Sequence, residues 1–283
     1  MSQPRTTQDF CVRRDDLHQV SWTPARDNPE RALAAGEVLL RVDRFGFSAN
    51  NITYALLGEL AQYWKFFPAP EGFGRVPVWG YADVVASSVP ELPEGERLYG
   101  YLPISPHLLI RPDQINAATC RDASEHRRAL PGTYQQYFRA RRGDPDEDVR
   151  MVLRPLFGTG FLIDDWLSDN GWFGAKRIVL ASASSKTAVA TAFSLAQRAQ
   201  RGFEIVALTS PAHRTFCEQL GYYDRVVDYA QIPSLAADVA SVFVDMAGNA
   251  EFVLMVVPCL LVLAFGEWQK DGRTSRDVTT AVG

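Results

Sequence analysis

A short turn rich in hydroxyl groups has the residue types that bind phosphate. Ser182-Ala-Ser-Ser-Lys-Thr187 follows an apolar run and precedes a helical pattern, where open α/β sheets hold phosphate at a helix N-terminus. It is neither a G-x-G-x-x-G turn nor a P-loop, because no glycine occurs between Gly174 and Gly202. The alternative is an N-capping cluster of Ser and Thr beside a surface lysine. The candidate phosphate ligands are Ser182, Ser184, Ser185, Lys186 and Thr187.

The segment after the next apolar run gives a second indication. NAD-binding sheets place an Asp or Glu there for the ribose 2′-hydroxyl, whereas NADP-binding sheets omit the acid and supply a cation. Residues 208–214 contain no acid, and Ser210, His213 and Arg214 could all face a 2′-phosphate. If a dinucleotide binds, this segment favours NADP over NAD.

Both segments belong to a part of the chain in which strands and helices alternate. Four buried strands are predicted by apolar runs at 177–183, 204–210, 225–229 and 241–246. Helices are predicted at 156–167, 187–201 and 214–220. This alternation indicates βαβ units with right-handed crossovers, and therefore a parallel sheet.

The first part of the chain predicts a different architecture. Residues 37–43 alternate apolar and polar side chains, and short strands at 76–87 and 97–101 follow, separated by Gly and Pro. This pattern is typical of an antiparallel barrel or sandwich. Residues 120–128 and 143–150 mix charges of both signs and predict exposed loop or helix. We expect a β-rich substrate domain at 1–150 and a dinucleotide-binding domain at 151–283.

Composition is that of an ordinary globular protein. The 283 residues are 47% hydrophobic and carry a net charge of -4, which disfavours a globally basic nucleic-acid binder. Four widely spaced cysteines and a polar N-terminus indicate reduced thiols in a cytoplasmic protein without a secretory signal. Residues 252–265 are strongly apolar but short and contain Pro258, so they predict a buried strand, with a membrane segment as the alternative.

Residues that could ligate a metal are far apart. Zinc sites need clustered Cys, His and carboxylate ligands. No histidine occurs between His18 and His107, and no cysteine between Cys11 and Cys120, so we expect no metal. Neither His107 nor His126 has a paired carboxylate at an interpretable spacing, which favours a surface or interface position over a general base.

Several short motifs follow one another along residues 37–249. They are Glu37-Val-Leu-Leu-Arg-Val, Asn50-Asn-Ile-Thr-Tyr-Ala-Leu-Leu-Gly58, Gly95-Glu-Arg-Leu-Tyr-Gly100, Leu208-Thr-Ser, Leu220-Gly-Tyr-Tyr-Asp-Arg-Val-Val-Asp-Tyr229 and Val244-Asp-Met-Ala-Gly248. In this order they resemble the medium-chain dehydrogenase/reductase superfamily, nearest its zinc-free quinone oxidoreductases. The serine-rich turn, with Pro77-Val-Trp-Gly-Tyr-Ala-Asp83, resembles an uncharacterised branch of it.

This resemblance implies an α/β protein, a GroES-like partly open β-barrel followed by a Rossmann-type parallel sheet, with NADP(H) as cofactor. It implies Tyr54 as the hydrogen-bond donor to a developing oxyanion, with Asn50 and Asn51 beside it. Thr159 would lie at a helix start near the nicotinamide. The alternatives are a packed core tyrosine beside capping asparagines, and a helix N-cap. The implied cofactor-binding residues are Ser182, Ser184, Ser185, Lys186, Thr187, Thr209, Ser210, Arg214, Tyr229 and Gly248.

Aromatic residues crowd one region of the first domain. They are Tyr63, Trp64, Phe66, Phe67, Phe73, Trp79 and Tyr81. Such a cluster could wall a pocket for a flat or apolar substrate. The alternative is a hydrophobic core with a loop packed over it.

The end of the chain departs from the superfamily pattern. A Rossmann sheet has about six strands, whereas only four convincing strands follow Lys176, and residues 268–283 are polar and unpatterned. We expect a truncated or divergent C-terminus and an incomplete sheet. An exposed apolar sheet edge would favour a homodimer.

The leading hypothesis is a zinc-independent, NADP(H)-binding oxidoreductase that transfers hydride to a small carbonyl, enone or quinone. No nucleic-acid or membrane partner is expected. A non-catalytic NADPH sensor or partner-binding protein fits the missing glycine motif equally well. An inactive, truncated homologue is the third alternative.

Overall fold

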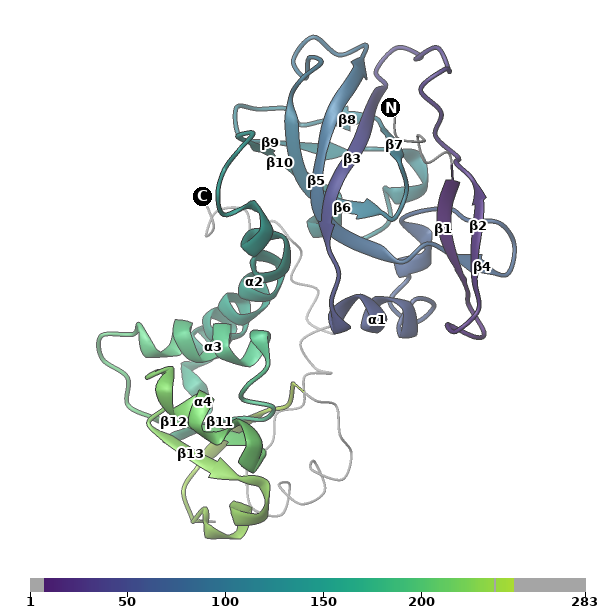
Figure 1. Ribbon diagram of the computed structural model, residues 1–283. Coiled ribbons are helices and arrows are strands. Elements are labelled where there is room, and N and C mark those ends of the chain that lie inside the picture. The colour runs from purple at the N-terminus through teal and green to yellow at the C-terminus, as the bar shows by residue number, and fades with distance from the viewer. Residues whose placement is uncertain (1–7, 237, 247–283) are drawn as a thin grey trace. The chain divides into compact units, whose positions relative to one another are not determined.

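The computed structural model describes residues 8–236 and 238–246, which form two compact units (Figure 1). The N-terminal unit ends at Val152, and the C-terminal unit begins at Leu153, within helix α2 (Glu147–Asp169). Gly248 and the segments 252–265 and 268–283 lie outside the described residues.

Antiparallel strands build the N-terminal unit. Seven of them form one sheet in the order β7-β3-β5-β6-β10-β9-β8. Their bounds are β3 Val38–Gly46, β5 Pro77–Ser87, β6 Arg97–Pro103, β7 His107–Ile110, β8 Pro112–Asp113, β9 Thr119–Asp122 and β10 Gln136–Ala140. Strands β7 and β8 stand at opposite ends of this order, yet only Arg111 separates them along the chain. The sheet therefore curls into a nearly closed barrel, which confirms the predicted barrel architecture.

A smaller sheet and one helix complete this unit. The sheet has the order β2-β1-β4, with β1 at Gln8–Arg13, β2 at Val20–Pro24 and β4 at Phe73–Gly74. Helix α1 covers Ala49–Leu56, and short 3₁₀ helices follow at Tyr63–Lys65, Glu125–Arg127 and Gly132–Tyr134. The Trp64 indole lies against Gly58 and Gly74, where an added Cβ would fall within 2.1 Å and 2.4 Å of the ring. Both positions therefore require glycine.

Aromatic side chains fill the barrel core. Phe66, Phe67, Trp79 and Tyr81 are buried there, and Trp79 stacks on Tyr99 at 5.7 Å between ring centroids. Aromatic pairs of this kind add stability beyond their buried area. The crowded aromatic residues are thus mainly core.

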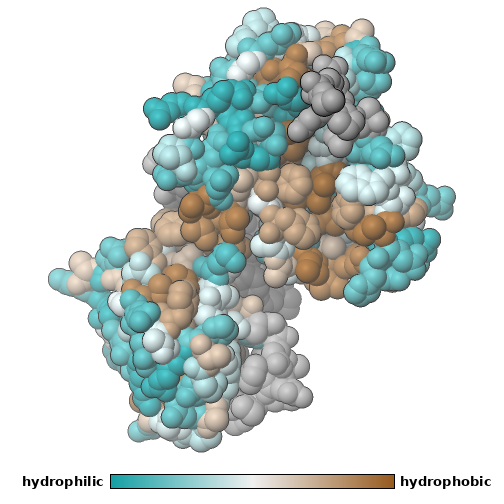
Figure 2. Space-filling model, viewed as in Figure 1, coloured by the Kyte–Doolittle hydropathy of each residue, from teal (hydrophilic) through white to brown (hydrophobic). Residues whose placement is uncertain are grey.

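Apolar side chains also remain exposed around helix α1. They are Phe47, Ile52, Leu56, Leu57 and Leu60. Figure 2 shows hydrophobic residues gathered over the end of the unit that carries this helix. A contiguous apolar surface of this kind is typical of a site that contacts a ligand or a protein.

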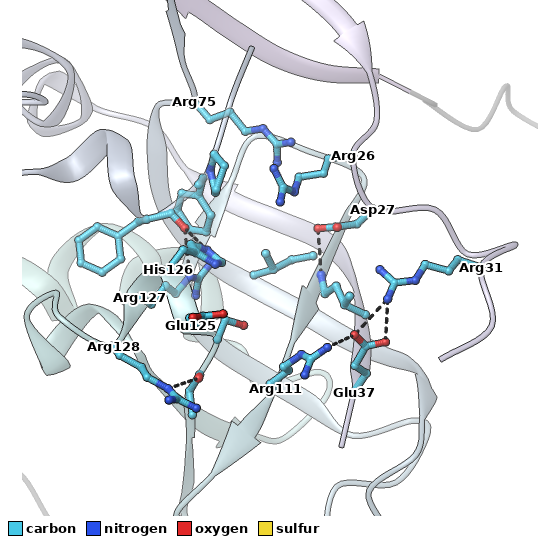
Figure 3. Close-up of a pocket in the computed structure, with 17 residues that line it drawn as sticks. Arg26, Asp27, Arg31, Glu37, Arg75, Arg111, Glu125, His126, Arg127 and Arg128 are labelled. Carbon is cyan, nitrogen blue, oxygen red and sulfur yellow. Dashed lines mark hydrogen bonds and ion pairs between the residues drawn. The ribbon is translucent and has the colours of Figure 1, made fainter. Parts of the chain in front are cut away.

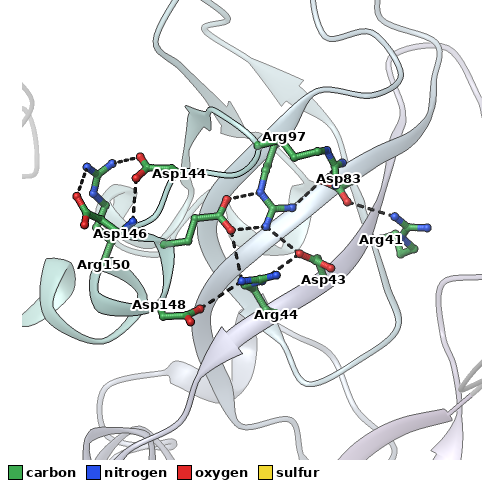
Figure 4. Close-up of polar contacts among 11 residues, drawn as sticks. Arg41, Asp43, Arg44, Asp83, Arg97, Asp144, Asp146, Asp148 and Arg150 are labelled. Carbon is green, nitrogen blue, oxygen red and sulfur yellow. Dashed lines mark hydrogen bonds and ion pairs between the residues drawn. The ribbon is translucent and has the colours of Figure 1, made fainter.

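A buried arginine connects the barrel strands to helix α2 (Figure 4). Arg97 on β6 is 3% exposed and donates to Asp83 on β5 at 2.8 Å and to Asp43 on β3 at 2.8 Å. It also forms a bidentate pair with Glu147, the first residue of α2. Burial raises the pKa of Asp83, but hydrogen bonds from Arg142 and then Arg97 outweigh it, and the pKa lies below its ordinary value.

The expectation that residues 120–128 are exposed is wrong for two of their charged side chains. Asp122 and Arg127 are 0% and 1% exposed and form an ion pair at 2.8 Å. Arg127 also donates to the Phe66 carbonyl at 3.0 Å and lies 4.6 Å from the centroid of the Phe67 ring. The interior tolerates these two charges because they are paired with each other and hydrogen-bonded. The carbonyl and the ring that Arg127 contacts belong to Phe66 and Phe67, which lie outside this segment.

A parallel sheet forms the core of the C-terminal unit. It has the order β13-β12-β11-β14, with β11 Arg177–Leu180, β12 Glu204–Thr209, β13 Arg225–Asp228 and β14 Ser241–Val244. Helices α3 (Lys186–Ala196) and α4 (Arg214–Gln219) connect β11 to β12 and β12 to β13, and 3₁₀ helices occur at Gly171–Gly174, Pro211–His213 and Tyr229–Ser234. The four predicted strands and their parallel arrangement are confirmed.

Alternate residues of these strands enter cores on the two faces of the sheet. Ile178 and Leu180 of β11 pack with Leu195 of α3 on one face. Val179 packs with Ile232 on the other. This two-sided burial explains why the strands are continuously apolar in sequence.

Two further observations concern the described residues only. None of their helices is both long and apolar enough to cross a bilayer. Cys11, Cys120 and Cys217 are free, buried thiols.

Replacing Arg97 with methionine should destabilise the N-terminal unit by about 3–5 kcal/mol, because Asp83 and Glu147 would lose their buried counter-ion and keep only the exposed Arg41, Arg142 and Arg44. Urea unfolding followed by near-UV circular dichroism of the aromatic core measures this. Arg41→Met is the matched control. Arg41 pairs with Asp83 from an exposed position and should cost about 1 kcal/mol or less. Equal losses for both variants would contradict the role assigned to Arg97.

Candidate functional site

The turn after β11 lies at the carboxyl end of the parallel sheet. Ser182 has a positive φ of 49°, the left-handed conformation that lets the chain reverse toward α3. Ala181 and Ala183 on either side are buried at 1% and 0% exposure. The small residues thus pack into the sheet, while Ser184 and Ser185 stay half-buried at the start of α3.

Ser185 is the N-cap of α3. Its hydroxyl accepts a hydrogen bond from the Ala188 N–H at 3.3 Å, as a helix N-cap does. Lys186 and Thr187 begin the helix, and the Lys186 ammonium is exposed. Thr187 contributes its carbonyl to the Thr191 hydroxyl at 2.9 Å. The turn therefore places the N-terminus of a helix beside an exposed cation, a combination that suits an anion.

Residues from the neighbouring strands meet this turn. The Ser182 N–H donates to the Tyr229 hydroxyl at 3.0 Å, and Tyr229 directly follows β13. Thr209 ends β12 and is buried, whereas Ser210 after it is half-buried and begins a 3₁₀ helix. The structure thus brings Ser182 and Tyr229 into contact at one edge of the sheet.

Arg214 is held by acidic side chains. It donates to Glu218 at 2.9 Å, Asp228 at 3.3 Å and the Gln231 side-chain oxygen at 3.3 Å. The hydrogen bond to Glu218 raises the pKa of this exposed guanidinium. The segment after β12 does not reveal Asp228, which lies at the end of β13. Because β12 and β13 are parallel, their carboxyl ends lie at the same edge of the sheet, and an acid at either end can reach Arg214.

In the N-terminal unit, Tyr54 lies on α1 with its ring in the aromatic core. It is 7% exposed, and its hydroxyl accepts a hydrogen bond from the Trp79 indole N–H at 3.1 Å. Burial raises the pKa of Tyr54 to about 12, although hydrogen bonds with Trp79 and Asn50 lower it in part. The phenol therefore keeps its proton at neutral pH and can act as a hydrogen-bond donor.

The two asparagines before Tyr54 have different surroundings. Asn51 is buried, accepts the Ser48 N–H at 2.7 Å and donates to the Pro77 carbonyl at 2.9 Å. It closes a capping box at the start of α1, as the capping alternative predicted. Asn50 is half-buried and shares a hydrogen bond with the Tyr54 hydroxyl.

The expectation that Thr159 lies at a helix start or N-cap is wrong. Thr159 is inside α2, which begins twelve residues earlier at Glu147 and passes through Pro155. Its hydroxyl donates to the Pro155 carbonyl one turn before it, at 3.1 Å. Pro155 removes one helical hydrogen bond, and the sequence pattern therefore placed the helix start after it.

Within 8–236 and 238–246, no group of three His, Cys, Asp or Glu side chains is arranged to hold a metal ion. The expected absence of zinc stays a prediction.

Comparison with known proteins gives a family and a fold. The family model described as "Protein of unknown function (DUF2855)" matches residues 45–261. No curated protein matches the sequence. Solved structures with a similar fold include the quinone oxidoreductase of Coxiella burnetii, with 13% identity and a TM-score of 0.50 over 89% of this chain and 72% of that one.

Two further structures extend this comparison. The quinone oxidoreductase of Thermus thermophilus, solved also in complex with NADPH, has 14% identity and a TM-score of 0.53, covering 96% of this chain and 85% of that one. The CurK enoyl reductase has 15% identity and a TM-score of 0.52, covering 96% and 87%. The barrel and the parallel sheet have the folds of the GroES-like and Rossmann-type domains of the medium-chain dehydrogenase/reductase superfamily.

Replacing Ser185 with alanine should lower the stability of the C-terminal unit by about 1 kcal/mol, because α3 would lose its side-chain cap. Thermal unfolding followed by far-UV circular dichroism measures this change. Ser184→Ala is the control, since the described residues give the Ser184 side chain no hydrogen-bond partner. A loss as large for Ser184→Ala would contradict the capping role.

Proposed function

The chain belongs to the family of proteins of unknown function DUF2855, and we propose that it is an oxidoreductase that binds NADP(H) through its C-terminal unit. The observation that carries the proposal is the turn 181–185, which opens into the N-terminus of α3 at the carboxyl edge of a parallel sheet. Ligands of such sheets bind at this edge. The NADPH complex of the Thermus thermophilus quinone oxidoreductase, a protein of similar fold, supports this choice of cofactor.

The turn would hold the pyrophosphate of the cofactor. N–H groups at the start of α3 and the hydroxyls of Ser182 and Ser184 supply donors, and the exposed Lys186 ammonium supplies positive charge. The Ser185 hydroxyl is already bonded to the Ala188 N–H, so Ser185 would support the site by capping α3 and not by binding phosphate directly. Thr187, the second residue of α3, and Thr209, the last residue of β12, would flank the pyrophosphate.

The preference for NADP rests on the residues after β12. Ser210 and Arg214 follow Thr209 without an intervening acid. Arg214 already balances Asp228 and Glu218, so a 2′-phosphate would have to compete with these carboxylates for it. We therefore expect a moderate preference for NADPH over NADH. Tyr229 would support the turn through its bond to the Ser182 N–H.

The substrate proposal rests on the N-terminal unit, with residues 1–150 as substrate domain and 151–283 as dinucleotide-binding domain. The bound cofactor supplies hydride chemistry. Tyr54, protonated and supported by Trp79 and Asn50, would donate a hydrogen bond to the oxygen that gains negative charge. Asn51 positions α1 rather than touching substrate. The exposed apolar side chains around α1 suit a small hydrophobic carbonyl, enone or quinone.

A second candidate function is a protein that binds NADPH without catalysis. Two observations favour it: Arg214 is engaged by Asp228 and Glu218, and the Tyr54 side chain is 7% exposed. Such a protein would bind the cofactor and leave it unconsumed. Zinc independence and a homodimer remain predictions within either proposal.

Titration with NADPH, followed by the fluorescence of the nucleotide, should show saturable binding. Lys186→Gln should weaken it about tenfold, because a charge-assisted bond to phosphate is lost. Lys176→Gln is the matched control: Lys176 is also exposed but precedes β11, at the amino end of the sheet, and its replacement should leave the affinity unchanged. No binding of NADPH at millimolar concentration would overturn the proposed cofactor.

A screen of quinones and enones with NADPH should reveal a substrate, and Tyr54→Phe should reduce kcat/KM for it about a hundredfold. The affinity for NADPH should not change, because Tyr54 belongs to the other unit. Tyr63→Phe removes a hydroxyl of the same aromatic cluster, bonded at 3.2 Å to Tyr134, and should keep most of the activity. Binding of NADPH with no turnover across the screen would favour the non-catalytic alternative.

A further inference from the structure

The N-terminal unit contains a cavity of about 400 Å³ (Figure 3). Its wall comes from the segment before β3, from Phe66 and Phe67, from the end of β7 and from residues 123–128. None of the residues that line it belongs to the C-terminal unit, where we place the cofactor. The proposed function therefore leaves this cavity unexplained.

Arginine dominates the polar lining. Six arginines contribute to it, namely Arg26, Arg31, Arg75, Arg111, Arg127 and Arg128, against the carboxylates of Asp27, Glu37 and Glu125. One of these carboxylates, buried Glu37, forms ion pairs with both Arg31 at 3.1 Å and Arg111 at 2.9 Å. The lining thus has three more arginines than carboxylates; Arg75 and Arg127 pair with Asp9 and Asp122 outside the lining, so a small excess of positive charge remains.

One buried arginine of the wall, Arg75, has a donor left over. Arg75 is 3% exposed and forms an ion pair with Asp9, but its buried Nε has no hydrogen-bond partner in the described part of the chain. The Arg26 backbone N–H binds the same Asp9 carboxylate oxygen, at 3.0 Å, and Figure 3 shows the Arg26 and Arg75 side chains extending toward each other. A buried, unsatisfied guanidinium N–H is costly. Two guanidinium groups that approach each other are stabilised by an anion between or beside them.

Histidine adds a neutral polar group to this wall. Burial, and then the charge of Arg127, lowers the pKa of His126, and its Nε2 lies 3.2 Å from the Phe66 carbonyl. The Ala34 N–H, and after it Arg111, keep the pKa of Glu37 low in spite of burial, so Glu37 stays ionised. The excess positive charge is therefore a property of the arginines at neutral pH.

The remaining wall is apolar. Phe66, Phe67, Pro68, Leu108 and Leu109 belong to it. Phe66 and Phe67 are 0% and 1% exposed, and Arg127 contacts them by its bond to the Phe66 carbonyl and its position over the Phe67 ring. The apolar surface open to a ligand therefore comes from the half-buried Pro68 and Leu109, and an apolar surface beside cationic groups selects ligands that have both characters.

We propose that this cavity is a binding site for a small organic anion, a phosphate monoester or carboxylate with an apolar ring or chain. The anionic group binds the exposed Arg26 guanidinium, next to that of Arg75, and the apolar part packs on Pro68 and Leu109. Arg128, exposed at the rim, adds a third cation. The site uses none of the residues of the turn 181–185 and does not depend on the proposed reductase activity.

Isothermal titration calorimetry of the full chain with phenyl phosphate, benzoate, inorganic phosphate and phenol tests this site. Phenyl phosphate or benzoate should bind, inorganic phosphate more weakly, and neutral phenol not detectably. Arg26→Gln should weaken the organic anion about tenfold, and Arg128→Gln should weaken it to a smaller extent. Both side chains are exposed, so these variants should keep the melting temperature of the parent protein.

Two controls separate this site from others. Arg225→Gln makes the same charge change at an exposed position of the C-terminal unit and should leave Kd unchanged. Lys186→Gln should also leave it unchanged, whereas it weakens NADPH. The proposal would be overturned if Arg26→Gln left the Kd of the organic anion unchanged. It would also be overturned if Arg225→Gln or Lys186→Gln raised that Kd as much as Arg26→Gln does. The failure of every anion to bind at millimolar concentration would overturn it as well.

Discussion

One buried guanidinium determines how the N-terminal unit is assembled. Arg97 connects three barrel strands to the first turn of α2 through Asp43, Asp83 and Glu147. Removing these charges from water costs several kcal/mol per ion, which close pairing must offset. The arrangement is therefore favourable only when all partners are in place at once. It makes the position of α2, the helix that leads into the parallel sheet, depend on correct barrel pairing.

Periodicity predicted the longest barrel strands, β3, β5 and β6, because a strand with a buried face must place apolar residues at fixed intervals. The parallel sheet was predicted for the same reason, since both of its faces are covered. Buried charged side chains produce no such periodic pattern in the sequence. Arg97 and Glu147 are fifty residues apart, and Asp122 and Arg127 lie in a segment whose mixed charges predict solvent exposure. Only the three-dimensional pairing distinguishes such residues from a solvated surface.

In the candidate site, too, some features were predictable from the sequence and others were not. The order of strands and helices was sufficient to place the serine-rich turn, Thr209 and Tyr229 at one edge of the sheet. It could not show that Tyr229 accepts the Ser182 N–H, or that Asp228 accepts a hydrogen bond from Arg214, because the order of strands and helices does not specify which side chains meet at the sheet edge. The Tyr54 environment depends on Trp79, from a strand that follows α1 by twenty residues or more. The positions of these residues at the sheet edge were thus predictable and their partners were not, while their role in binding stays a prediction.

The turn after β11 also shows what a nucleotide-type sheet needs when glycine is absent. In glycine-rich turns the missing Cβ lets the phosphate approach the backbone. Here Ser182 adopts the left-handed conformation at an energetic cost, and Ala181 and Ala183 keep the packing tight. A Tyr229 hydroxyl occupies the Ser182 N–H, so one backbone donor is already used. In the proposed cofactor site, phosphate binding would then depend more on the start of α3 and on Lys186 than on the backbone of the turn itself.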